Sequence, residues 1–319
     1  MDDGTLFCMA NKHRQPVDPL PDFLGIGAPR AGTTWLHTRC AEHPELWVPP
    51  VKELHYFDRS PAYQSPVRLA EPSPLRRMLG RSAPAQQYRR GARRLVWQAF
   101  RRDVPGAWRW RARFLLGYYD DRWYASLFRE AAGLVKGEIT PGYSLLTDAD
   151  VARVRTLMPD LKIIFLMRDP VDRAWSAVRR RDRSSGELLD LLYTPGILER
   201  GNYLHTLRTW EHHFPREQIF IDFYDRLCEA PGALFQDVCR FLDVDPGALA
   251  DEAGGRAVNA APAAEMPRDV HVTLASHYRD TLRGLSERFG GYPTRWHEAA
   301  ERVLSEAASS ATSEHTRQR

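Results

Sequence analysis

The stretch GIGAPRAGTTW, residues 25–35, decides the fold, because it joins an apolar run to a helical pattern through a glycine-rich turn. Its glycines have the spacing GxxxxG and two threonines follow, which is typical of a loop that holds phosphate between a strand and a helix. Gly32 allows an unusual φ and a close approach of the backbone, and the N–H groups from Arg30 onward are expected to face an anion. The loop therefore predicts an anion site at a helix N-terminus.

The loop lacks the lysine of a nucleotide-hydrolysing phosphate loop, which would read GK[ST] after its second glycine. Thr33 stands in that position, and Arg30 brings a cation inside the loop instead. The hydroxyls of Thr33 and Thr34 can donate to phosphate oxygens, whereas Pro29 has no N–H to donate. The missing lysine argues against a P-loop kinase of small molecules, which stays an alternative.

Short apolar runs rich in branched residues alternate with helical patterns along the chain. The runs predict buried strands at 22–28, 134–139, 161–167 and 218–223. The helical patterns cover 33–43, 170–182 and 231–242, and a further helix that Asp148 could cap ends before Pro159. This alternation predicts an α/β fold with a parallel sheet that helices cover on both faces.

The chain is expected to form a single domain over residues 21–300, between a flexible N-terminus at 1–20 and a flexible tail at 301–319. Residues 61–133 break the alternation and predict a mostly helical insertion over the carboxyl edge of the sheet. Open α/β sheets bind ligands at that edge. We therefore expect the insertion to bind the acceptor of a reaction.

Arginine is concentrated in part of this insertion. Residues 75–115 contain twelve arginines and one acid, Asp103, so the segment carries a charge of +11 in a chain of net charge +4. Large aromatic residues are interleaved with them: Trp97, Phe100, Trp108, Trp110 and Phe114. The segment is expected to attract nucleic acid, anionic lipid or an acidic substrate, or else to be a solvated helix face with aromatics packed inward. A nucleotide- or RNA-binding protein is therefore a second alternative.

The remaining composition indicates a cytoplasmic protein without a metal. No apolar run approaches the roughly 20 residues that span a bilayer, and no secretory segment opens the chain. Four cysteines, at positions 8, 40, 228 and 239, lack the spacing of a zinc site or a disulfide framework. The histidines show no ligand pattern, and His212 and His213 are expected to face different ways on a helix.

Two segments resemble sulfotransferases that use 3′-phosphoadenosine 5′-phosphosulfate (PAPS). LGIGAPRAGTTWL (24–36) is similar to their donor-binding loop, and LKIIFLMRDPVDRAWSAV (161–178) is similar to their 3′-phosphate motif, which Arg168 and Ser176 fit. Three more stretches resemble the branch that includes heparan sulfate sulfotransferases and bacterial enzymes: VKELHYFD (51–58), GEITPGYS (137–144) and residues 201–227. An ion pair of Arg168 with Asp169 or Asp172 is the structural alternative.

The resemblance implies a P-loop-NTPase-like, three-layer fold with a central parallel sheet and a helical, Arg- and aromatic-rich insertion. It also implies in-line transfer of the sulfonate group from PAPS to an acceptor hydroxyl, with adenosine 3′,5′-bisphosphate (PAP) as the product and no metal. The expected donor-binding residues are Arg30, Ala31, Gly32, Thr33, Thr34, Trp35, Arg168 and Ser176. The acceptor is expected to be a small or glycan-like molecule, anionic or aromatic, and not a nucleic acid.

Glu53 occupies the position of the family's catalytic glutamate and is the expected general base, with His55 as its rival. Arg30 is expected to stabilise the leaving phosphate. Lys52 could polarise the bridging oxygen or contact the acceptor, or it could be a solvated surface lysine. The chain departs from the family in carrying Arg30 in place of a loop lysine and Ile139 where related glycan enzymes have lysine.

Overall fold

The computed structural model of the chain describes residues 19–60, 63, 73–82, 85–86, 88–90, 92, 107–179, 184–249 and 265–317. Within them, a sheet of five parallel strands has the order β2-β3-β1-β4-β5. The strands are β1 (Phe23–Gly27), β2 (Leu46–Trp47), β3 (Val135–Ile139), β4 (Lys162–Met167) and β5 (Ile219–Phe223). Four of them confirm the predicted apolar runs. The sequence missed β2, because two residues are too few to show a strand pattern.

Helices connect the strands and cover the sheet. Before β4 the α-helices are α1 (Thr33–Glu42), α2 (Pro74–Leu79), α4 (Ala107–Leu116), α5 (Asp121–Ser126) and α6 (Asp148–Leu157). After β4 they are α7 (Pro170–Val178), α8 (Ser185–Leu192), α9 (Tyr203–His213), α10 (Tyr224–Glu229), α11 (Pro231–Phe241), α12 (Arg268–Phe289) and α13 (Gly291–Arg317). Short 3₁₀ turns are η2 (Arg129–Ala131), η3 (Pro141–Leu145), η4 (Glu199–Gly201) and η5 (Arg216–Gln218).

Four helix boundaries differ from the prediction, and those of α1 and α11 differ by one residue at the C-terminal end. The cap of α6 is Thr147 and not Asp148, since the Thr147 hydroxyl accepts the N–H of Asp150 at 3.3 Å. A threonine that precedes the first helical residue has the extended backbone a cap needs, whereas Asp148 is already helical. The helix that follows β4 ends at Val178, four residues before the predicted end at 182.

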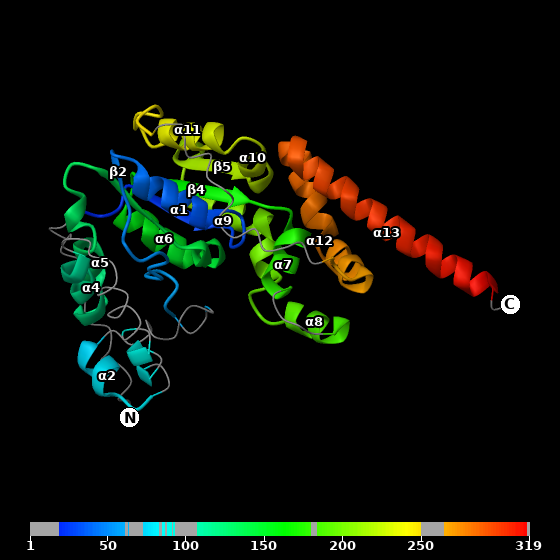
Figure 1. Cartoon of the computed structure of the whole chain (residues 1–319), viewed down its shortest axis with the longest axis horizontal. Coiled ribbons are helices and arrows are strands. Elements are labelled where there is room, and N and C mark those ends of the chain that lie inside the picture. Colours follow the sequence, from blue (N-terminus) through cyan, green and yellow to red (C-terminus); the bar gives the residue numbers. More distant parts are fainter. Residues whose placement is uncertain are drawn as a thin grey trace, which may run out of the picture.

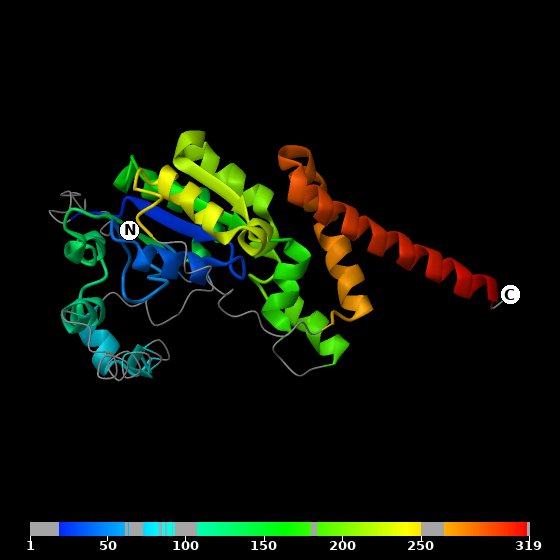
Figure 2. The same cartoon turned by 45° about the horizontal axis from the view of Figure 1, so that its top comes forward.

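Aromatic contacts show how the helices are layered. Trp35 of α1 packs edge-on against Phe235 of α11, with ring centroids 6.1 Å apart. Tyr203 of α9 packs edge-on against Phe165 of β4 at 5.7 Å, and α9 lies beside α6. The two helix pairs cover opposite faces of the sheet, as Figures 1 and 2 show together. The predicted α/β class, three layers and parallel sheet are confirmed.

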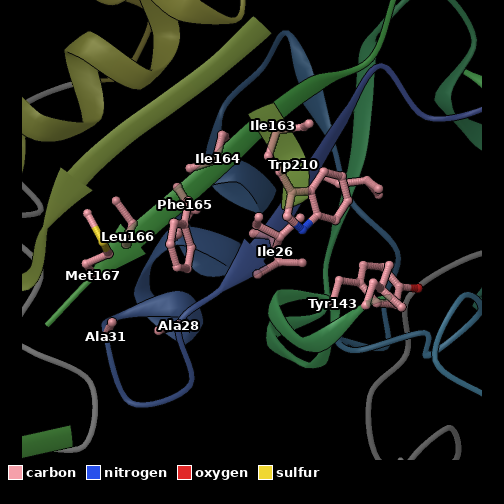
Figure 3. Close-up of a cluster of buried hydrophobic side chains, with 14 of the residues drawn as sticks. Ile26, Ala28, Ala31, Tyr143, Ile163, Ile164, Phe165, Leu166, Met167 and Trp210 are labelled. Carbon is pink, nitrogen blue, oxygen red and sulfur yellow. The ribbon is translucent and has the colours of Figure 1, made fainter. Parts of the chain in front are cut away.

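The core forms where the central strands meet these helices. Residues 163–167 of β4 are almost completely buried, as an all-parallel strand covered on both faces should be. Figure 3 shows Ile26 of β1, Phe165 and Trp210 of α9 in this cluster, with Ala28 at the start of the glycine-rich loop. Burying each large apolar side chain contributes about 1.5–3 kcal/mol, so the loop starts from a rigid base.

The described part of the insertion packs beside the sheet, on the side of β2 (Figure 1). Tyr124 of α5 stacks on Tyr56 with centroids 4.3 Å apart, and Phe128 packs against Trp47 of β2 at 6.0 Å. Much of the Arg-rich segment, including residues 93–106, lies outside the described residues.

The C-terminal helices α12 and α13 form a hairpin beyond β5, and α13 projects away from the sheet (Figure 1). Helix α13 continues to Arg317, through most of the segment 301–319 for which the sequence predicts a flexible tail. Its alanines and glutamates favour helix, and Arg268 of α12 donates to the Ser310 hydroxyl at 2.7 Å. Among the described helices, none is long and apolar enough to cross a membrane.

Candidate functional site

A cavity of about 700 Å³ lies at the carboxyl ends of the strands. Because the strands are parallel, the segments that follow them meet at this edge of the sheet. Pro29 follows β1, Gly142 follows β3, Arg168 follows β4 and Tyr224 follows β5, and all four line the cavity. The cavity therefore lies where the glycine-rich loop predicted a ligand.

Gly32 shapes the loop as predicted. Its φ of 85° lies in the left-handed region, and a Cβ there would lie 2.2 Å from Leu227 Cδ2. Helix α1 then begins at Thr33 without a side-chain cap and without an acid in its first turn. Its first N–H groups have no partner within the helix, so their positive end is open to an anion.

Some residues of the loop line the cavity and others are buried beneath it. Arg30 and Trp35 line the cavity, and Arg30 has a left-handed φ of 71°. Ala31 is fully buried, and its N–H donates to the carbonyl of Ala28 at 3.1 Å. The expectation that every N–H from Arg30 onward faces an anion is thus wrong at Ala31, because the tight turn uses that N–H internally.

Lys52 brings a second cation to the loop, which has no lysine of its own. Its Nζ donates to Thr33 Oγ1 at 3.2 Å and to Thr34 Oγ1 at 3.3 Å. It also pairs with Glu53 Oε1 at 3.0 Å. The lysine therefore reaches the start of α1 from a different segment of the chain. This position does not fit a solvated surface lysine.

Three charged side chains next to Lys52 form a chain of contacts. Nδ1 of His55 donates to Asp58 Oδ2 at 2.8 Å, and Nε2 lies 3.6 Å from Glu53 Oε2. Burial alone would lower the pKa of His55, but Asp58 and Glu53 outweigh it and raise that pKa to about 9. Burial alone would raise the pKa of Glu53, but His55 and Lys52 outweigh it and lower that pKa to about 2. At neutral pH, His55 is therefore protonated and Glu53 is ionised.

The raised pKa of His55 predicts how stability changes with pH. Protonated His55 stabilises the fold fully below its unfolded pKa of about 6.5, and this contribution is lost as the pH rises through about 9. We therefore compare the free energy of unfolding of wild type with that of His55→Gln. The difference between the two proteins should be about 3 kcal/mol larger at pH 6 than at pH 10. Urea unfolding at both pH values measures this difference, and a gap that does not change with pH would contradict the ion pairing.

Arg168 and Ser176 form the second part of the cavity wall. Arg168 lies over the ring of Tyr224 at 4.7 Å, and its contact with Asp172 is long, at 3.4 Å. Among the described residues, its buried Nε has no hydrogen-bond partner. Ser176 of α7 lines the same cavity, so the structure brings the two residues of the predicted 3′-phosphate motif together. Asp172 is a weak partner, which leaves the guanidinium available to a ligand.

Sequence reasoning missed several residues of this site. Asp58 lies in a quoted stretch, and its spacing of three after His55 was the available signal. Arg173, Arg179 and Arg200 also line the cavity, and nothing in their local pattern distinguishes them from other arginines of this basic chain. Their buried Nε atoms have no hydrogen-bond partner among the described residues.

None of the described residues of the insertion at 61–133 lines this cavity. The cavity is lined instead by Arg200 of η4 and by Ile197 just before it, and the charges of Arg200 and Glu53 interact. Acceptor binding by the insertion therefore stays a prediction for the part of it that lies outside the described residues.

A model of a known protein family matches this sequence. The sequence model described as "Sulfotransferase family" matches residues 21–246, which is most of the chain. The mouse heparan sulfate glucosamine 3-O-sulfotransferase 3B1 is 31% identical over 137 residues. That alignment covers 38% of this chain and 34% of the mouse protein, so the similarity spans about a third of that relative's length.

Solved structures show the same fold. A sulfotransferase from Alicyclobacillus acidocaldarius superposes with a TM-score of 0.58 at 20% identity, covering 87% of this chain and 99% of that one. The sulfotransferase domain of the Synechococcus PCC 7002 olefin synthase gives a TM-score of 0.50 at 21% identity, with coverages of 78% and 81%. At these identities the likeness concerns the fold alone.

Proposed function

Since this chain belongs to the sulfotransferase family, we propose that it transfers the sulfonate group of PAPS to a hydroxyl of its acceptor. The observation that carries this proposal is the meeting of two anion-binding elements in one cavity. The loop with Lys52 forms one of them, and Arg168 with Ser176 forms the other. PAPS has two phosphate-bearing ends, and each element suits one end.

The residues present fit the donor. The uncapped start of α1 and the cradle at Gly32, which a Cβ would fill, suit the 5′-phosphosulfate end. The unpartnered Nε of Arg168 and the hydroxyl of Ser176 suit the 3′-phosphate, because a guanidinium gives phosphate a paired, charge-assisted grip. Trp35, the last residue of the loop, remains a proposed donor contact. Ala31 shapes the turn through its own hydrogen bond to Ala28 and does not contact the donor.

Glu53 is the proposed general base. His55 cannot accept a proton while its pKa is about 9, so the structure favours Glu53 over its rival at neutral pH. Glu53 takes the proton of the acceptor hydroxyl while that oxygen bonds to sulfur and the bond from sulfur to the 5′-phosphate oxygen breaks. Arg30 lies in the loop and Lys52 contacts its threonines, so both can stabilise the charge that develops on the departing phosphate.

A carboxylate with a pKa of about 2 is a weak base, and donor binding can change this. Lys52 contacts both Glu53 and the loop threonines. Anionic groups of the donor at the loop attract Lys52 and add negative charge beside Glu53. Both effects raise the pKa of Glu53 and make it a better base once the donor is bound.

The charge of the cavity supports an anionic acceptor. Among the described residues, five arginines, Lys52 and protonated His55 line it, against the single carboxylate of Glu53. The donor brings about four negative charges at neutral pH, which leaves positive charge unmatched. The charge of Arg200 interacts with the carboxylates of Asp58 and Glu53, so we assign Arg200 to the acceptor side. Glycan-like hydroxyl acceptors are consistent with the mouse relative, whose name refers to heparan sulfate glucosamine.

Calorimetric titration with PAP and with ATP tests the proposed donor. We expect PAP to bind at least about tenfold more tightly than ATP, with or without Mg²⁺, because only PAP carries a 3′-phosphate for Arg168. Tighter binding of ATP would favour the kinase alternative. Binding of a short RNA that is strongly salt-dependent and survives Arg168→Ala would favour the RNA-binding alternative. A screen of phenols and acidic sugars with labelled PAPS then identifies the acceptor class.

A further inference from the structure

The motif GEITPGYS, singled out in the sequence, places a buried carboxylate against residues 53–56, the catalytic segment that carries Glu53 and His55. Glu138, 1% exposed at the end of β3, accepts four hydrogen bonds. They come from the Thr140 hydroxyl at 2.7 Å, the Tyr124 hydroxyl at 2.7 Å, the Tyr143 hydroxyl at 2.9 Å and the N–H of Leu54 at 3.3 Å. All four partners donate, so the ionised carboxylate satisfies them together.

Tyr143 extends this network from Leu54 to Tyr56, two residues further along the segment. Its hydroxyl oxygen accepts the N–H of Tyr56 at 2.8 Å while its proton goes to Glu138. The N–H groups of Leu54 and Tyr56, on either side of His55, are therefore both fixed from β3 and η3. Neither Glu138 nor Tyr143 lines the cavity.

The backbone of the segment explains why it needs support. Glu53 has a φ of 64° and His55 a φ of 54°, so two non-glycine residues lie in the left-handed region. Each such residue costs about 1–2 kcal/mol relative to a right-handed or extended backbone. Hydrogen bonds at Leu54 and Tyr56 offset this cost and turn the side chains of Glu53 and His55 to the same side.

We propose that Glu138 and Tyr143 are positioning residues, which hold the backbone of the segment so that Glu53 and His55 face each other at the cavity. This proposal rests on the proposed role of Glu53 as the general base. Neither residue touches the donor or the acceptor, and each acts only through the N–H groups it accepts. The GE and Y positions of the motif thereby receive a role in the reaction, separate from ligand binding.

Two tyrosines provide a matched test, because each donates its hydroxyl to Glu138 and only Tyr143 also accepts a backbone N–H from the segment. Tyr143→Phe and Tyr124→Phe each remove one hydroxyl from the same buried carboxylate. The readout is the pKa of the His55 imidazole, followed by NMR in protein labelled at histidine and assigned by comparison with His55→Gln. Calorimetric affinity for PAP reports whether the fold is intact.

We expect Tyr143→Phe to lower the pKa of His55 by about one unit, since His55 then loses its fixed place beside Glu53 and Asp58. Tyr124→Phe should leave that pKa within about 0.3 units, and both variants should bind PAP within about twofold of wild type. An unchanged pKa in Tyr143→Phe, or equal falls in both variants, overturns the proposal. The base role of Glu53 is judged separately by its own variant, so the two failures are distinguishable.

A second, independent observation concerns Asp148, His212 and His213. The expectation that the two histidines face different ways is wrong: His212 Nδ1 and His213 Nε2 both contact Asp148 Oδ1, at 3.0 Å and 2.8 Å. The rings can meet because α9 ends here and the ring centroids are 4.6 Å apart. The ligand atoms of the three residues lie within 4.8 Å of one another.

We infer that this cluster binds a divalent transition-metal ion such as Zn²⁺. Two ligands bonded to one zinc ion at 2.0–2.1 Å lie roughly 3.0–3.4 Å apart, so the Asp148 contacts need little adjustment. His212 is the most exposed of the three and is free to rotate toward an ion. Two imidazoles and a carboxylate suit zinc better than magnesium or calcium, and the ion would join the start of α6 to the end of α9.

Calorimetric titration of ZnSO₄ into the full chain, made without a histidine tag and stripped with chelator, tests this site. We expect one equivalent to bind and to raise the thermal midpoint, and His213→Ala to weaken binding at least about tenfold. His205→Ala is the control, since His205 is an exposed histidine of the same helix outside the cluster. Absence of Zn²⁺ binding to wild type, or equal losses in both variants, overturns this inference.

Discussion

Glu53→Gln is expected to lower the rate of sulfonate transfer by on the order of 10²–10⁴-fold while leaving the affinity for PAP within about twofold. The amide keeps the size of the side chain and can still contact Lys52, but it cannot accept the proton of the acceptor hydroxyl. Donor binding depends on the loop, Arg168 and Ser176, which the substitution leaves in place.

The measurement combines labelled PAPS turnover, with the acceptor found by screening, and calorimetry with PAP. His55→Gln is the informative comparison, because it removes the rival base and leaves the Glu53 carboxylate. We expect a smaller loss for His55→Gln, and an alkaline limb near pH 9 in the wild-type rate profile that this variant lacks. Full activity of Glu53→Gln would refute the role of Glu53 as the general base, and a different group would then have to accept the proton.

The parts of the site that sequence could predict are those whose chemistry is local. The loop at 25–35 contains its own turn residue and the helix that follows, so Gly32 could be assigned from spacing alone. The four longer strands could be predicted because a parallel strand buried on both faces is a continuous apolar run. Arg168 and Ser176 could be paired because one directly follows a strand and the other lies on the next helix.

What could not be predicted depends on packing between distant segments. Lys52 lies 18 residues beyond Thr34, and no local pattern shows that its Nζ returns to the threonine hydroxyl. Glu138 was visible as part of a motif, but a carboxylate within a strand does not reveal which N–H groups it accepts. The side on which the described part of the insertion packs, next to β2, could not be predicted either, because helical propensity says nothing about the surface on which a helix packs.

Arg168→Ala is expected to weaken PAP binding by on the order of 100-fold, the largest effect on donor affinity that we predict for one side chain. The guanidinium is held between the carbonyl of Arg30 and the ring of Tyr224, with its Nε buried and unpartnered among the described residues. A 3′-phosphate would complete its hydrogen bonds. Ser176→Ala removes a single hydroxyl and should cost about three- to tenfold.

Two matched variants separate this role from a structural one. Asp172→Asn removes the partner that Arg168 contacts at 3.4 Å, and PAP affinity should stay equal or rise, since a competing carboxylate is gone. Arg200→Ala removes another arginine of the same cavity, on the side of Glu53, and should change PAP affinity by less than about threefold because the donor ends lie elsewhere. If Asp172→Asn weakens PAP binding as much as Arg168→Ala does, the arginine serves the helix and not the 3′-phosphate. If Arg200→Ala does so, the cavity does not divide into a donor side and an acceptor side.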